Sequence, residues 1–269
     1  MNIFHAIFLG IIQGLTEFLP ISSSAHLALL EHYLNVQEAG LAFDVLLHVG
    51  TLVALIAYFW QEWLDMFKAL LRPERQNRFE RRLFWYLVIA TVPGALAGFF
   101  LEKQAETVFR APTRIAILLG VMGIILYLGD RLARHQRQLQ GITLTDAILV
   151  GCAQALAIMP GVSRSGSTMT MGLFLGFTRE TAARFSFLLS TPIIFGAGLY
   201  HALKLFKAGG NTFFALPHIL GFLAAIVSSY FTIKFLLQFL RRHTFVIFAL
   251  YRILLAIVVL VLEFFKFHP

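Results

Sequence analysis

The chain has 269 residues, of which 58% are hydrophobic and only 13% are charged, and its mean hydropathy is +0.77. A soluble domain of this length needs a larger charged fraction to cover its surface, so the composition argues for an integral membrane protein. The net charge of +8 falls in short basic clusters between apolar runs, where it sets the orientation of membrane helices. We therefore expect a membrane as partner and no nucleic acid. Cys152 is the single cysteine, which excludes an intramolecular disulfide.

Six apolar segments have about the 20 residues that a membrane-crossing helix needs. They are residues 41–60, 82–101, 113–130, 180–203, 215–238 and 243–265. Two further apolar stretches, 2–34 and 144–177, are each interrupted near the middle by proline and a serine cluster. Each half is short for a crossing, so we predict two re-entrant helical hairpins.

The two halves of the chain resemble each other. QGLTEFLPISSS (13–24) aligns with QALAIMPGVSRS (154–165) after one gap, and FDVLLHVG (43–50) aligns at a similar offset with FSFLLSTP (185–192). The alternative is a likeness of composition alone, but the pattern and its order both favour an internal duplication.

Each copy would contain one hairpin followed by three crossings. Because three is an odd number, the second copy must lie upside down relative to the first. The predicted fold is therefore an all-α integral membrane protein with six transmembrane helices, two re-entrant hairpins and an inverted-topology repeat. It forms a single membrane domain over 1–269, with the first repeat at 1–130 and the second at 141–269.

Basic residues predict the orientation. The connections 61–82 and 131–140 are rich in arginine and should be cytoplasmic, whereas 102–112 and 204–214 should face outward. Both termini then lie outside, and the first hairpin enters from the outer face and the second from the cytoplasmic face. Their tips are expected to meet near the membrane midplane.

Polar side chains are concentrated at these two tips, where burial in the membrane is costly without a cavity or partner. Each cluster opens a helix, whose first N–H groups and positive dipole end attract anions. Arg164 adds a fork that suits phosphate oxygens. The first tip contains Gln13, Glu17, Ser22, Ser23, Ser24 and His26, and the second contains Ser163, Arg164, Ser165, Ser167 and Thr168.

A carboxylate and an imidazole beside this anion site favour phosphoryl transfer. Glu17 is expected to act as base or metal ligand, and Ser22, Ser23 or His26 to attack or shuttle a proton. A purely structural Glu17–Arg164 pair is the alternative. Asp44 completes the site or holds Arg164. Arg252 is expected to pair with an acidic residue or carbonyls, and His48 to lie in a span interior.

Two motifs resemble those of the undecaprenyl pyrophosphate phosphatase family, also known for bacitracin resistance. QGLTEFLPISSSAH resembles its (E/Q)-x-x-x-E motif with serine and histidine, and PGVSRSGST (160–168) resembles its PGxSRSxxT motif. The resemblance implies removal of one phosphate from undecaprenyl pyrophosphate, which recycles the lipid carrier of peptidoglycan synthesis, and a divalent cation, Mg²⁺ or Ca²⁺. It also implies the bacterial inner membrane and a site open to the periplasm. A homodimer is left open.

Carried onto this chain, the resemblance assigns catalysis to Glu17, Ser23, His26 and Arg164, with Glu17 as metal ligand. The substrate is expected to bind Gln13, Ser22, Ser24, Asp44, Ser163, Ser165 and Thr168. Gln13 stands where the more acidic form of the motif has glutamate, which weakens a metal role there. The rival function is a flippase or transporter of a lipid phosphate, which uses the same inverted repeats and broken helices.

Overall fold

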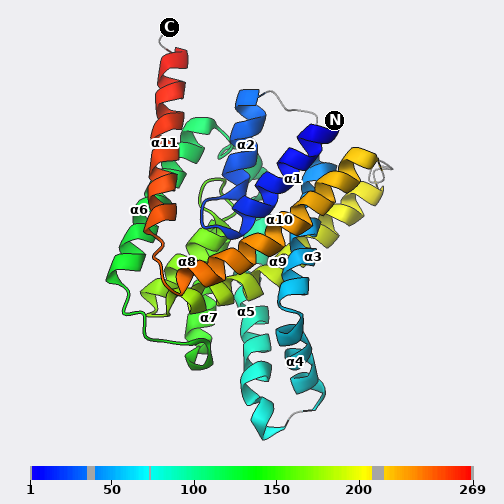
Figure 1. The fold of residues 1–269 in the computed structure, drawn as a ribbon, viewed down its shortest axis with the longest axis vertical. Helices are drawn as coiled ribbons and strands as arrows, with labels where there is room; N and C mark the ends of the chain where they lie inside the picture. The colour runs from blue at the N-terminus through cyan, green and yellow to red at the C-terminus, as the bar shows by residue number, and fades with distance from the viewer. Residues whose placement is uncertain (1, 35–39, 73, 208–214, 268–269) are drawn as a thin grey trace.

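The protein is described by a computed structural model covering residues 2–34, 40–72, 74–207 and 215–267 (Figure 1). This part of the chain forms α-helices and short 3-10 helices and contains no β-strand, which confirms the all-helical prediction. The α-helices are α1 (Ile3–Phe18), α2 (Ser23–Leu34), α3 (Gly40–Tyr58), α4 (Trp60–Leu71), α5 (Arg78–Thr107), α6 (Pro112–Leu132), α7 (Leu144–Leu156), α8 (Arg164–Phe174), α9 (Arg179–Lys207), α10 (Leu216–Leu240) and α11 (Val246–Phe267). The 3-10 helices are η1 (Arg75–Asn77) and η2 (Leu139–Gly141).

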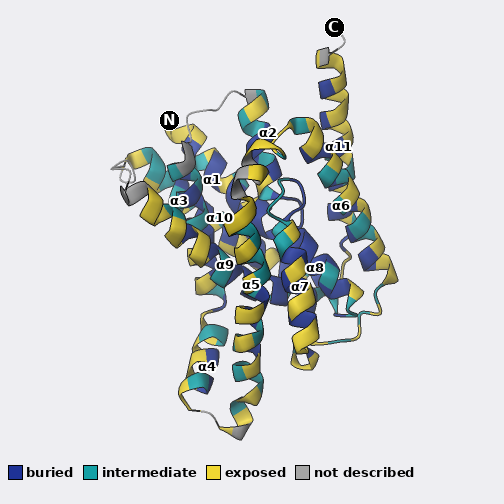
Figure 2. Cartoon of the chain, turned by 180° about the vertical axis from the view of Figure 1, so that it is seen from behind, coloured by how far each residue is buried: buried dark blue, intermediate teal, exposed yellow. Residues whose placement is uncertain are grey.

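Five of the described helices, α5, α6, α9, α10 and α11, are each long and apolar enough to cross a membrane. A sixth crossing is added if α3 and α4 count as one bent span, since the two helices are inclined by 72° around Phe59. Large apolar side chains such as Phe99 and Leu132 are exposed, as lipid contact requires, and Figure 2 shows exposed residues along most of the helices. The chain is therefore a multi-pass membrane protein.

Helix α4 lies where the sequence predicted only a polar connection at 61–82. Met66 and Ala69, three positions apart, form one buried face of α4, while Asp65 and Lys68 are exposed. A helix with one apolar face is stable when that face is packed, and α4 packs against α5. In Figure 1 the pair extends below the other helices.

The two interrupted segments each form a helix, a turn and a second helix, as predicted. Helix α1 ends at Phe18 before Pro20, and α2 begins at Ser23; α7 ends at Leu156 and α8 begins at Arg164. A proline cannot continue the hydrogen-bonding of a helix that precedes it, which explains the first interruption. Figure 1 shows the two turns near the centre of the molecule, approached by their helices from opposite ends.

Two glycines let the hairpins pack closely on long helices. A Cβ at Gly14 of α1 would lie 1.9 Å from Oγ of Ser228 on α10, and a Cβ at Gly151 of α7 would lie 2.5 Å from the carbonyl oxygen of Ala90 on α5. Small residues at such crossings allow backbones to approach. Helix α6 packs along α11, and α3 lies between α9 and α10. The turns are thereby enclosed by crossing helices.

The connection before α7 is held by Arg137. Its Nη1 and Nη2 donate to Oδ1 and Oδ2 of Asp146 at 3.0 and 2.5 Å, and Nη1 also donates to the carbonyl oxygen of Leu175 at 2.9 Å. Burial alone would raise the pKa of the Asp146 carboxyl, but hydrogen bonds from Arg137 and Thr143 outweigh burial and hold that pKa below its usual value. This forked ion pair joins the start of α7 to the end of α8.

Candidate active site

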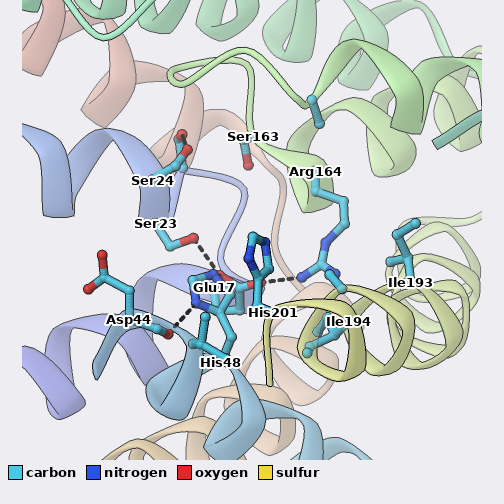
Figure 3. A pocket seen from close by; sticks show the side chains of 15 residues that line it. Glu17, Ser23, Ser24, Asp44, His48, Ser163, Arg164, Ile193, Ile194 and His201 are labelled. Carbon is cyan, nitrogen blue, oxygen red and sulfur yellow. Dashed lines mark hydrogen bonds and ion pairs between the residues drawn. The ribbon is translucent and has the colours of Figure 1, made fainter. Parts of the chain in front are cut away.

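A cavity of about 300 Å³ lies where the two turns meet (Figure 3). Its wall combines residues from both hairpins with residues of α3 and α9. The polar lining residues are Glu17, Ser22, Ser23, Ser24, Asp44, His48, Ser163, Arg164 and His201. Side chains that are far apart in the sequence therefore share one small space inside a largely apolar protein.

The Glu17 carboxylate is the centre of this cluster and is buried. Arg164 Nη2 donates to its Oε1, and Ser23 Oγ donates to its Oε2. Gln13 Nε2 also donates to Oε2 at 3.1 Å, and His48 Nε2 lies 3.9 Å from the same oxygen. The pairing with Arg164 satisfies the condition under which a buried charge is tolerated.

Ser22 and Ser163 occupy matching positions in the two turns. Their φ angles are 75° and 71°, in the left-handed region that non-glycine residues adopt rarely. Each hydroxyl accepts from the backbone N–H three residues later, at 3.4 Å from Ala25 and 3.0 Å from Gly166, as helix-capping serines do. Ser22 Oγ also accepts from the backbone N–H of Gly161 at 3.2 Å, which links one turn to the other.

Arg252 of α11 forms hydrogen bonds with both turns. Its side chain is completely buried. The guanidinium donates to the carbonyl oxygens of Pro20 at 3.0 Å, Gly161 at 2.7 Å and Val162 at 3.0 Å, and Nε donates to that of Leu119 at 3.3 Å. Of the two predicted kinds of partner for Arg252, an acidic residue or carbonyls, the structure shows carbonyls, and through them Arg252 contacts both turns.

The family described as bacitracin resistance protein BacA matches residues 6–258. The chain belongs to the BacA family. Relatives named undecaprenyl-diphosphatase include one from Pelotomaculum thermopropionicum, 51% identical over 97% of each chain, and one from Moorella thermoacetica, 52% identical over 95% of this chain and 96% of the relative. A third, from Gemmatimonas aurantiaca, is 52% identical over 96% of this chain and 97% of its own length.

Seven of the residues predicted for the site line the cavity of this BacA family member. They are Glu17, Ser22, Ser23, Ser24, Asp44, Ser163 and Arg164. Gln13 lies behind the wall and bonds Glu17. Ser165 Oγ donates to the carbonyl oxygen of Leu19 at 2.9 Å, and Thr168 Oγ1 lies 2.6 Å from Ser186 Oγ, so both hydroxyls are used in packing the second hairpin.

His26, predicted to be a catalytic residue, is not among the residues that line the cavity. Its Nδ1 lies 2.7 Å from the carbonyl oxygen of Ser22, and its Nε2 lies 2.6 Å from the hydroxyl of Tyr251 on α11. The ring is thus held between the first turn and α11. Ser23 is the hydroxyl of this turn that contacts Glu17.

His48 and His201 are site residues that the sequence reading did not select. His48, assigned to a span interior, lines the cavity instead, because Asp44 and His48 are four residues apart and share one face of α3. That spacing was a usable signal. His201 of α9 also lines the cavity, but a single histidine within a long apolar helix carries no such signal.

The described residues supply only some of the ligands that a divalent cation needs. Among the described residues, no group of three or more His, Cys, Asp or Glu side chains is arranged to hold a metal. Glu17 and Asp44 nevertheless line the same cavity. Mg²⁺ is commonly bound by one or two carboxylates together with substrate phosphates, so the residues fit a cation that arrives with a pyrophosphate.

Proposed function

We propose that this protein is an undecaprenyl-diphosphatase that hydrolyses undecaprenyl pyrophosphate to undecaprenyl phosphate and inorganic phosphate, an activity that confers bacitracin resistance. The observation that carries the proposal is the cluster of the buried Glu17 with the partly buried Ser23 and Arg164, which joins a carboxylate, a hydroxyl and a guanidinium in one cavity. We infer the substrate from relatives about half identical in sequence, which are named undecaprenyl-diphosphatase.

The pyrophosphate is bound at the meeting point of two helix starts. Ser23 is the first residue of α2 and Arg164 the first of α8, so the N-terminal ends of both helices lie at the cavity. Their positive dipole ends and unsatisfied N–H groups favour a multiply charged anion. Arg164 exchanges part of its contact with Glu17 for phosphate oxygens, since its fork suits both partners.

Ser23 is assigned as the attacking group. Its oxygen forms a bond to the terminal phosphorus while Glu17 accepts the hydroxyl proton, and the bond from that phosphorus to the bridging oxygen breaks, releasing undecaprenyl phosphate. A water molecule then attacks the phosphoserine, giving inorganic phosphate and restoring the Ser23 hydroxyl. Arg164 stabilises the charge that develops on the phosphoryl oxygens.

Glu17 and Asp44 would hold the divalent cation of the family resemblance together with phosphate oxygens. The cation would supply positive charge that neutralises the pyrophosphate. Glu17 would contribute one carboxylate from α1, and Asp44 would contribute a second from α3. Neither residue is expected to bind the cation tightly before the substrate enters, because the carboxylate of Glu17 is already hydrogen-bonded on both oxygens.

The finer fold that we propose is an inverted repeat of 1–130 and 141–269, with six crossings and two re-entrant hairpins. The matching φ angles and capping bonds of Ser22 and Ser163 support it, since these residues are equivalent under the offset between Gln13 and Gln154. The helix packing also supports it. Helix α1, which opens the first half, packs on α10 of the second half, and α7, which opens the second half, packs on α5 of the first.

The basic connections support an orientation with the α4–α5 and α6–α7 connections in the cytoplasm. In that orientation both termini lie outside, consistent with the start of α1 and the end of α11 at the same end of the molecule (Figure 1). The location that follows is the bacterial inner membrane, with a site that receives its substrate from the periplasmic side.

Phosphate release from undecaprenyl pyrophosphate by protein purified in detergent tests the function, because no transport is possible there. Wild-type protein should release phosphate, and Glu17→Ala or Arg164→Ala should lower the rate by at least about a hundredfold. Arg184→Ala, which breaks an ion pair with Glu62 outside the site, is the matched control and should stay near wild type. Near-normal turnover by either site variant would overturn the assignment, and absence of release by the wild type would favour the transporter.

A further inference from the structure

A second hollow of about 580 Å³ opens beside the cavity, between α5, α7 and α9. We call it the lateral groove. It shares Ala157, Arg164, Ile193, Ala197 and His201 with the polar cavity. The remaining lining is mostly small or apolar, including Ala95, Phe99, Ile158 and Tyr200. The lateral groove is therefore an apolar continuation of the site that begins at Arg164.

Two helix faces that include small residues form walls of the lateral groove. On α5 the face contains Thr91, Gly94, Ala95 and Gly98, and on α9 it contains Pro192, Ile193, Gly196 and Ala197. Spacings of three and four residues place each set on one side of its helix.

Small faces in membrane helices usually allow two helices to pack in contact. Here they do not serve that purpose, because a Cβ added at Gly98 or Gly196 would meet no atom within 4 Å. By contrast, a Cβ at Gly151 on α7 would collide with the backbone of α5. Gly98 and Gly196 therefore border open space rather than a helix interface, whereas Gly94 is packed against Gln154 of α7.

Gln154 of α7 is a buried polar residue in the wall of the lateral groove. Its side chain lines the lateral groove and is only 4% exposed, and its Oε1 has no hydrogen-bond partner. Its Nε2 makes one long contact, 3.5 Å to the carbonyl oxygen of Ala90. A buried polar atom without a partner is unfavourable, so a water molecule at the wall of the groove is expected to bind Oε1.

We propose that the lateral groove binds the prenyl chain of the substrate next to the pyrophosphate, and that Gly98 and Gly196 keep its path open. The proposal rests on the proposed function and names the path and residues of that same site. The occupant follows from continuity, because a molecule with phosphates at Arg164 and an apolar tail has one end in each space.

The size of the lateral groove limits what it holds. Pockets of about 300–1,000 Å³ accommodate drug-sized ligands, so a groove of about 580 Å³ holds the isoprene units nearest the phosphates. The rest of the chain extends between α5 and α9 into the lipid. Chain recognition is then decided by the first units, and a bulky side chain in the path should discriminate against long chains.

The first experiment compares two substrates in detergent, undecaprenyl pyrophosphate and a prenyl pyrophosphate with a single isoprene unit. Gly98→Leu and Gly196→Leu should lower kcat/KM for the long substrate on the order of tenfold and leave that for the short one within about twofold. Gly141→Leu is the matched control, since Gly141 also borders open space but lies in η2 away from the site. Equal effects on both substrates, or no effect on the long one, would overturn the proposal.

A second measurement does not depend on turnover. In a Cys152→Ala background, Gly196→Cys is labelled with a maleimide in the presence of undecaprenyl phosphate or of inorganic pyrophosphate. Undecaprenyl phosphate should slow labelling several-fold and pyrophosphate should not. Protection without phosphate release would contradict the proposed function while supporting the lateral groove. Phosphate release without protection would support the function and contradict the lateral groove.

Discussion

Glu17 and Arg164 are 147 positions apart in the chain, yet Arg164 donates a hydrogen bond to Oε1 of Glu17 inside the protein. Their side chains are only 6% and 16% exposed. The pair joins the end of α1 to the start of α8, so it holds the two hairpins together as well as lining the cavity. Its contributions to stability and to chemistry can be separated by experiment.

The buried ion pair should show strong coupling in unfolding. Glu17→Gln leaves the Arg164 charge without its partner, so the free energy of unfolding should fall by about 3–5 kcal/mol. Adding Arg164→Gln to this variant should cost much less than Arg164→Gln does alone. Denaturant unfolding in detergent, applied as a double-mutant cycle, measures the coupling.

The exposed pair of Arg241 and Glu180, with side chains 62% and 34% exposed, is the control. Glu180→Gln should change stability by less than about 1 kcal/mol. If the changes at Glu17 and Arg164 are additive, the two side chains do not form the pair in the folded protein.

Arg252 is predicted to be a positioning residue. Arg252→Met removes the donors to carbonyls of both turns, and hydrogen bonds from charged donors contribute about 1.5–3 kcal/mol each, so stability and kcat should both fall. KM should change little, because Arg252 is not in the cavity lining. Arg252→Lys should restore part of kcat. Rates with undecaprenyl pyrophosphate and thermal unfolding test this, with the exposed Arg242→Met as control. A rise in KM at unchanged kcat would contradict it.

The attacking group can be identified by trapping. If Ser23 attacks, a brief reaction with substrate labelled at the terminal phosphate should leave label on the protein that survives acid and is lost in base. Ser23→Ala should abolish that label. Label that is lost in acid and survives base would instead assign attack to His26, since phosphohistidine is acid-labile.

Cation dependence should involve Asp44. Chelation should lower phosphate release by the wild type, and Asp44→Asn should raise the Mg²⁺ or Ca²⁺ concentration needed for half-maximal rate by on the order of tenfold, because one carboxylate is removed. Asp65→Asn, at an exposed carboxylate of α4, is the control. An unchanged cation requirement in Asp44→Asn would exclude Asp44 as a ligand.

Some elements follow from the sequence alone because their causes are local. Proline and serine clusters interrupt helices wherever they occur, so both interruptions were predictable, and runs of about 20 apolar residues predict membrane helices in the absence of any contact. The polar groups of the site were predictable for the same reason, since Glu17 and Arg164 are charges in apolar surroundings. Helix α4 was missed because its apolar face is narrow and depends on packing against α5.

Other features were decided only by the tertiary structure. The sequence predicts that the two tips meet, but it does not predict that Ser23 rather than His26 contacts Glu17. That contact depends on the left-handed turn at Ser22 and on Tyr251 of α11, whose hydroxyl is hydrogen-bonded to the imidazole of His26. The lateral groove likewise depends on the packing of distant helices, because Gly98 of α5 and Gly196 of α9 line one hollow and neither has another atom within 4 Å of an added Cβ. Composition determines that a chain enters the membrane, whereas the direction of each side chain is determined by helices that pack together from distant parts of that chain.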